Sequence, residues 1–227
     1  MSDILSHLLQ SQALEQEINQ LGLRNRVNSL RSWQCARLLI SYDELYQQKK
    51  YRPAMDFFTD ELYGPNDFSE RDEDIKKVLP LMETVLSRET LATFELALKL
   101  NTLSYQLDFD LVRSLGDVTD ISSEQYARAY LSCNNQEQRQ LQLELIEMLA
   151  NSLAGIARRR SIMLVLKLSR KPAKLAGLGE LQAILERGAD AFRKIKKIDD
   201  FINPILQGET AIMQNLFAGK NCLPESL

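Results

Sequence analysis

Adjacent carboxylates near the C-terminus are the residues of this chain most suited to metal chemistry. Asp199 and Asp200 open the segment DDFIN, and carboxylate oxygens are ligands that hold Mg²⁺, often together with a substrate phosphate. Such a site needs further oxygen ligands, and Asp108 and Asp110 are the nearest candidates. Because the helix-breaking Pro204 follows and no convincing second segment of this kind is present, Asp199 and Asp200 form only a weak candidate metal site.

His7 is the only histidine, and this argues against several kinds of active site. Two-metal carboxylate centres in helical bundles require paired Glu-x-x-His units, and haem proteins usually require an axial histidine. No Gly-x-Ser-x-Gly segment is present, so a Ser-His-Asp hydrolase is not indicated. His7 itself lies one position off an apolar helical stripe, which favours a solvated side chain. We therefore expect no cofactor, and the sequence favours a non-enzymatic protein without excluding an enzyme.

A second set of polar residues stands on segments that are otherwise apolar. Arg37 lies within CARLLI, where a buried charge requires a carboxylate partner because an unpaired one is strongly destabilising. Asn101, Tyr105 and Asp108 share one face of a helix predicted over residues 88–115. The four residues form either a satisfied polar network in the core or the lining of a pocket. We favour the network, with Arg37 paired to Asp108.

Positive charge is concentrated in residues 155–197, which hold twelve Lys and Arg against three Asp and Glu. This local balance of +9 leaves −12 for the rest of a chain whose net charge is −3. Such a surface could bind a polyanion, or it could pair with the acidic region 56–74. No nucleic-acid motif and few aromatic residues accompany it, so nucleic acid is the less favoured partner. The candidate anion-binding residues are Arg158, Arg159, Arg160, Lys171 and Lys174.

The cysteines and the hydropathy pattern predict a cytoplasmic protein with no membrane partner. Cys35, Cys133 and Cys222 are odd in number and widely spaced, which argues against a disulfide framework or a Cys-x-x-Cys metal site. The longest apolar run, residues 162–166, is too short to cross a bilayer, and the N-terminus lacks the pattern of a signal peptide.

Apolar residues recur at helical spacing along the whole chain, and no segment alternates as a strand does. We expect an all-α fold of about eight or nine helices, packed as an irregular bundle around a central apolar helix over about 88–115. One long helix is predicted over residues 136–170, with Gly155 as the place where it could bend, and another over 179–201. A stop at Tyr63-Gly64-Pro65 and a capped restart at Ser69 are also expected. Residues 1–218 are expected to form a single domain, with 219–227 as a flexible C-terminal tail.

Specific sequence blocks identify the chain with a family. The blocks are FFTDELYGPNDFSERDEDIKKVLPLM, LATFELALKLNTLSYQLD and KLAGLGELQAILERGADAF. Together they resemble a family of uncharacterised bacterial all-helical proteins with FFxxELYGPxDFxxRDxD and LAGLGELQ blocks, over roughly residues 37–217. The resemblance implies the fold and no activity, so no catalytic residue follows from it.

Three functions remain open. The favoured one is a cytoplasmic binding or regulatory module that engages another protein chain or forms a homodimer; it predicts no large cavity. The alternative is a metal-dependent enzyme acting on a phosphorylated substrate, because DDFIN resembles the aspartate-rich motif of all-α isoprenoid synthases. That enzyme predicts a central pocket with Asp108, Asp199 or Asp200 facing it. The third function is binding of a polyanion or nucleic acid through residues 155–197.

Overall fold

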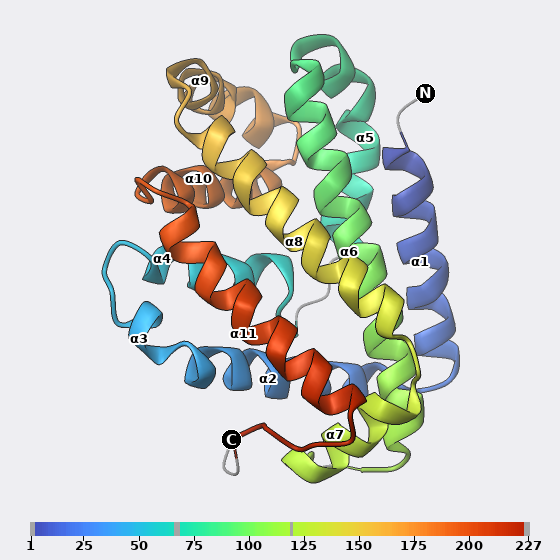
Figure 1. The fold of residues 1–227 in the computed structure, drawn as a ribbon. Helices are drawn as coiled ribbons and strands as arrows, with labels where there is room; N and C mark the ends of the chain where they lie inside the picture. The colour runs from blue at the N-terminus through green and yellow to red at the C-terminus, as the bar shows by residue number, and fades with distance from the viewer. Residues whose placement is uncertain (1–2, 66–68, 119, 225–227) are drawn as a thin grey trace.

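The computed structural model describes residues 3–65, 69–118 and 120–224. Within these ranges the chain forms eleven α-helices and one π-helical segment, and it has no strand, which confirms the all-α class (Figure 1). The elements are α1 Ile4–Gln20, α2 Arg24–Ser41, α3 Asp43–Tyr46, α4 Arg52–Phe57, η1 Phe58–Leu62, α5 Ser69–Val85, α6 Arg88–Leu115, α7 Ser123–Ser132, α8 Gln136–Ala157, α9 Arg160–Leu175, α10 Gly179–Arg193 and α11 Asp199–Phe217.

Helix α6 lies at the centre of the bundle. It begins at the N-cap Ser87, whose hydroxyl accepts a hydrogen bond from the backbone N–H of Thr90 at 3.2 Å. It then packs against α1, α2, α7 and α8, and α11 packs against the far side of α8 (Figure 1). Because α6 has neighbours on several sides, its buried residues are spread around the helix, from Thr93 to Val112.

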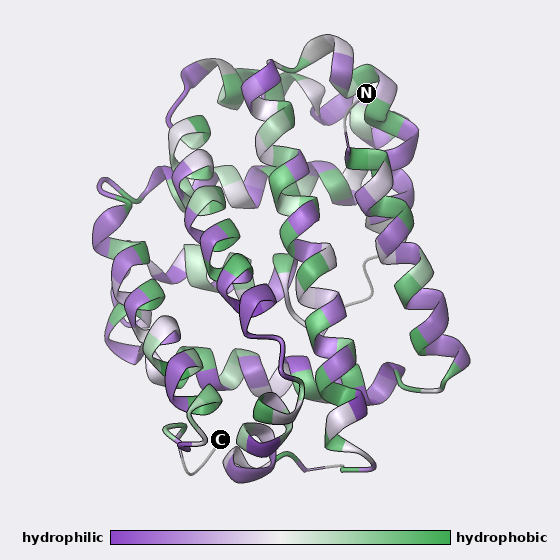
Figure 2. Cartoon of the chain, turned by 45° about the vertical axis from the view of Figure 1, so that its right-hand side comes forward, coloured by the Kyte–Doolittle hydropathy of each residue, from purple (hydrophilic) through white to green (hydrophobic). Residues whose placement is uncertain are grey.

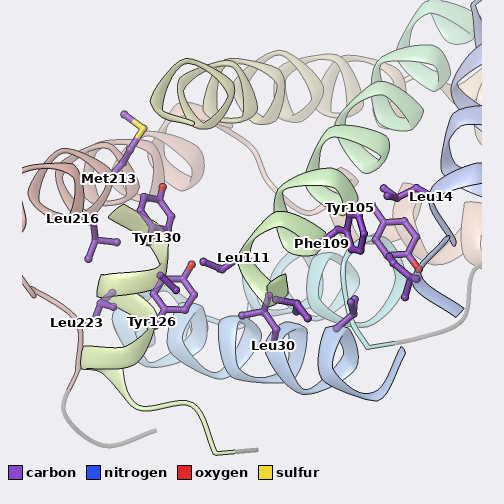
Figure 3. Packing of buried hydrophobic residues seen from close by; sticks show 14 residues of the cluster. Leu14, Leu30, Tyr105, Phe109, Leu111, Tyr126, Tyr130, Met213, Leu216 and Leu223 are labelled. Atoms are coloured by element: carbon purple, nitrogen blue, oxygen red, sulfur yellow. The ribbon is translucent and has the colours of Figure 1, made fainter. Parts of the chain in front are cut away.

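Apolar residues from five helices and the C-terminal segment form one core cluster (Figure 3). Leu30, Leu111 and Leu216 are fully enclosed there, and Tyr126 and Tyr130 project from α7 in the same direction. Leu223 is also buried, and the Ser123 hydroxyl donates a hydrogen bond to the Pro224 carbonyl. Leu223 and Pro224 therefore contact the bundle, whereas residues 218–222 are exposed and residues 225–227 lie outside the described part of the chain.

A second cluster joins α4 to α8, α10 and α11 through Tyr51, Met55, Phe57 and Phe192. Helix α10 approaches Phe57 closely at Gly188, where a built Cβ would lie 2.6 Å from the Phe57 Cζ. Any larger residue at position 188 would collide with the Phe57 ring, so Gly188 allows α10 to pack closely against α4.

Two predicted helix boundaries are wrong. The helix expected over 136–170 ends at Ala157, and α9 starts anew at Arg160 after Arg159 takes an extended conformation. The helix expected to reach Phe201 ends at Arg193, and Phe201 lies in the first turns of α11. Both breaks fall where Arg or Lys residues cluster, and the first lies two residues after Gly155, the position considered for a bend.

Hydrophobic and hydrophilic residues alternate along the helices, as expected when each helix buries one face (Figure 2). Among the described residues, no helix combines the length and the apolar character that crossing a bilayer requires.

Candidate functional site

A cavity of about 400 Å³ lies inside the bundle. Its wall is built mainly from apolar side chains on α4, α5, α6, α8, α9, α10 and α11. A volume of this size falls in the range of cavities that hold small organic ligands.

The wall that α8 contributes is a continuous stripe. Arg139, Ile146, Ala150, Leu153 and Ala157 all line the cavity and follow one another at helical spacing. At a rise of 1.5 Å per residue, the stripe from Arg139 to Ala157 extends over about 27 Å. The cavity is therefore elongated along α8.

The two ends of the cavity differ in polarity. Near Ala157 the wall is completed by apolar side chains of α9, including Ile162 and Leu166. Near Arg139 the wall carries Gln142 and Ser104, and the Gln142 Nε2 donates a hydrogen bond to the Ser104 hydroxyl at 2.8 Å. This polarity gradient suits a molecule with one polar end.

Arg139 is the unusual residue of the polar end. Its side chain is buried at 5% exposure, and its Nη1 donates to the Gln142 Oε1 at 3.2 Å. Its guanidinium carbon lies 4.7 Å from the centroid of the Tyr130 ring, a cation–π contact. Among the described residues, however, neither Nε nor Nη2 has a hydrogen-bond partner.

The charge of Arg139 is nevertheless retained. Burial alone would lower the pKa of its guanidinium, but Tyr130, Tyr126 and Asp108 act in the opposite direction, and the net effect raises the pKa. The site thus holds a buried cation with two nitrogens, Nε and Nη2, that have no hydrogen-bond partner among the described residues.

Beside the cavity, Asp108 is the hub of a satisfied network. The carboxylate accepts hydrogen bonds from the Arg31 Nε at 2.9 Å, the Gln34 Nε2 at 3.1 Å and the Tyr63 hydroxyl at 2.8 Å. Burial opposes the charge on Arg31, but Asp108 outweighs it and raises the pKa of Arg31. Burial and the same carboxylate raise the pKa of Tyr63. The network binds α2, α6 and the segment after η1 together.

Arg37 belongs to a second pair. Its Nη2 donates to the Glu209 Oε2 at 2.9 Å, its Nη1 donates to the Glu209 Oε1, and the Tyr42 hydroxyl donates to Oε1 at 3.0 Å. Burial and the Glu209 carboxylate raise the pKa of Tyr42, so its proton stays in this hydrogen bond. The expected pairing of Arg37 with Asp108 is wrong, because Arg31 and Glu209 satisfy these two groups separately.

Four residues were expected either to form a polar network in the core or to line a pocket, and the structure shows both arrangements. Arg37 and Asn101 line the cavity. Asp108 is fully enclosed in its network, and Tyr105 packs its ring on Arg31, with 4.2 Å from the guanidinium carbon to the ring centroid.

Sequence reasoning missed Arg31, Gln34, Arg139 and Glu209. The spacing of the buried residues of α2 would have indicated Arg31 and Gln34, since both continue the stripe from Val27 to Arg37.

The predicted metal and anion residues lie on the surface. Asp199 and Asp200 are exposed in the first turn of α11, and the described residues contain no group of three or more His, Cys, Asp or Glu positioned to hold a metal. The Arg158 Nη2 donates to the Ile195 carbonyl at 3.1 Å, and the Arg159 Nη2 donates to Glu89 at 2.6 Å. These two arginines therefore stabilise helix packing, whereas Arg160, Lys171 and Lys174 are exposed on α9.

Comparison with known proteins gives one match. A family model described as "Domain of unknown function (DUF8198)" matches residues 13–222. Neither the curated proteins nor the solved structures include a significant match to the chain.

Proposed function

The chain belongs to the DUF8198 family, and we propose that it is a binding protein that holds a small, largely apolar molecule in its central cavity. The observation that carries this proposal is the elongated cavity of about 400 Å³ with a predominantly apolar wall.

The volume of the cavity supports the proposal energetically. Apolar space inside a protein costs about 24 cal/mol per Å³ when nothing fills it. The cavity is partly open to solvent, so this value gives the direction of the effect: an apolar occupant is favoured over an empty cavity. Water gains little in apolar surroundings because it finds too few hydrogen-bond partners. An apolar ligand removes this penalty.

The groups around the cavity favour binding over catalysis. Glu209 lines the cavity, but Arg37 and Tyr42 already engage its carboxylate. Asp199 and Asp200, which the enzyme hypothesis requires in the pocket, are exposed at the start of α11. The protein thus has the central cavity that the enzyme hypothesis predicts, but Asp199 and Asp200 do not face that cavity as the same hypothesis requires.

A neutral apolar fluorophore tests this function. We expect N-phenyl-1-naphthylamine to bind the delipidated protein with one-to-one stoichiometry and increased fluorescence. Ala150→Phe places a large side chain into the cavity wall and should abolish most of this signal, whereas Met148→Phe, at an exposed position of the same helix, should not. A probe that binds both variants equally, or does not bind the wild type, overturns the proposal.

A protein partner, a second copy of the chain included, remains a second candidate. The favouring observation is the exposed apolar surface of α9, where Leu164, Leu168 and Leu175 are 58%, 69% and 90% exposed. Leu168→Asp should shift any dimer seen by sedimentation velocity towards monomer, and a wild type that sediments as a monomer at high concentration speaks against self-association. The free cysteines Cys35, Cys133 and Cys222 fit the proposed cytoplasmic location in a bacterial cell.

A further inference from the structure

We propose that the polar end of the cavity binds the carboxylate of a long-chain monocarboxylic acid, through Nε and Nη2 of Arg139. This inference rests on the proposed function and adds to it the chemical class of the ligand and the atoms that recognise it.

The first argument is the geometry of the free donors. Nε and Nη2 lie along one edge of the planar guanidinium, and their two N–H bonds point the same way, which is the arrangement that holds both oxygens of a carboxylate. The same edge does this elsewhere in the molecule, where the Nε and Nη2 of Arg170 bind the two oxygens of Glu186. Among the residues that the structure describes, no carboxylate is hydrogen-bonded to this edge of Arg139.

The second argument is the charge balance inside the protein. The buried carboxylate of Asp108 and the half-buried carboxylate of Glu209 are each paired with an arginine of their own, Arg31 and Arg37. Arg139, at 5% exposure, has no carboxylate hydrogen-bonded to it within the described part of the chain. Its guanidinium carbon lies 4.7 Å from the centroid of the Tyr130 ring, and its Nε and Nη2 have no hydrogen-bond partner there. Since the net effect of the surroundings keeps this guanidinium charged, an anion at its free edge would form an ion pair in a site shielded from water.

The third argument concerns the size and charge of the anion. One guanidinium edge supplies two donors and one positive charge, which match a carboxylate; a doubly charged phosphate would need more donors and more charge. Beyond Arg139 the wall of α8 continues with Ile146, Ala150 and Leu153 towards the apolar end at α9. A carboxylate at Arg139 therefore directs an extended hydrocarbon chain along the length of the cavity.

The experiment compares dodecanoate with dodecan-1-ol, which has the same chain and no charge. Each displaces N-phenyl-1-naphthylamine from the wild type, from Arg139→Leu and from Arg139→Lys. We expect the wild type to prefer the acid by about tenfold or more, as a charge-assisted hydrogen bond implies. Arg139→Leu should bind the two compounds within about twofold of each other, and Arg139→Lys should recover part of the preference because it keeps the charge but not the fork.

Arg170→Leu is the matched control. It removes the same type of side chain with the same edge-on geometry, but from an exposed pair on α9, so the preference for the acid should stay at the wild-type value.

The outcomes separate the two proposals. Equal affinity of the wild type for acid and alcohol overturns the assignment of the carboxylate and leaves the apolar cavity intact as a binding site. A preference for the acid that survives in Arg139→Leu overturns the assignment of Arg139. If neither compound displaces the probe and the probe itself does not bind, the proposed function fails together with the inference.

Discussion

Filling the cavity from its wall should stabilise the protein. Ala150 on α8 lines the cavity and is 6% exposed, so Ala150→Phe extends an aromatic ring into apolar space without creating a solvent-exposed ring. Ala154, one turn further along the same helix and 2% exposed, does not line the cavity. The two alanines form a matched pair that differs in the space in front of the side chain.

The two substitutions should change the free energy of unfolding in opposite directions. Burying a Phe side chain contributes about 1.5–3 kcal/mol, and at position 150 this gain should appear as an increase in the free energy of unfolding of the delipidated protein. At position 154 the added ring must displace packed atoms, and overpacking of this kind costs typically about 1–3 kcal/mol. The difference between the two variants should therefore be at least about 2.5 kcal/mol, which is the sum of the two lower limits.

Urea denaturation followed by circular dichroism at 222 nm measures both values on the same preparation. A change in the transition midpoint at constant slope reports stability. If Ala150→Phe destabilises the protein as much as Ala154→Phe does, the space along α8 is closed in solution, and the reasoning from the cavity is refuted.

Three further perturbations test the polar network and the helix packing. Asp108→Ala should lower the free energy of unfolding by about 3–5 kcal/mol, because it leaves Arg31 buried without its partner. Asp110→Ala, two positions along the same helix, should change this free energy by less than about 0.5 kcal/mol. Equal effects of the two substitutions in urea denaturation would contradict the central role of Asp108 in the network. Gly208→Ala should lower the free energy of unfolding by about 1–3 kcal/mol, because the new methyl group collides with the Tyr42 hydroxyl. Gly155→Ala, with open space around it, should raise the free energy of unfolding by about 0.5–1 kcal/mol. Thermal melts of both variants test these opposite effects. Burial, Asp108 and Asp60 raise the pKa of the Cys35 thiol from 9.0 to about 11. The folded protein therefore holds this proton at a pH where the unfolded chain has lost it, and the free energy of unfolding should fall as pH rises from about 9 to about 11. Cys35→Ser should flatten the dependence of stability on pH in this range, and an unchanged dependence would count against the shift.

The fold class followed from the sequence because it rests on local signals. Residues 88–115 are apolar on nearly all sides, so a central position for this helix was predictable, and α6 occupies it. The serine at position 87 and the apolar periodicity of α8 are also local features. Gly155 indicated a bend near the end of α8 but not the complete break at Ala157, after which Arg158 donates a hydrogen bond to the distant Ile195 carbonyl.

The site was harder to predict because pairing partners are distant in the chain. Asp108 was correctly expected to be buried or paired by its place on a central helix, but its partner Arg31 lies 77 residues away and Arg37 looked equally suitable. Arg139 sits among polar residues in QEQRQLQ, which suggests an exposed position. Only its place at the start of the stripe that continues through Ile146 and Ala150 indicates that it faces inward. A pocket wall and a packed interface share the same periodicity, so the volume of the cavity becomes visible only in three dimensions.

Native mass spectrometry of protein purified without detergent tests the central claim most directly, because it detects the ligand itself. The account predicts a mass increment that disappears on denaturation, matches one long-chain monocarboxylic acid per chain and is reduced in Arg139→Leu. A wild-type protein that carries no increment and acquires none after incubation with dodecanoate would contradict the claim that the cavity is a binding site for such an acid.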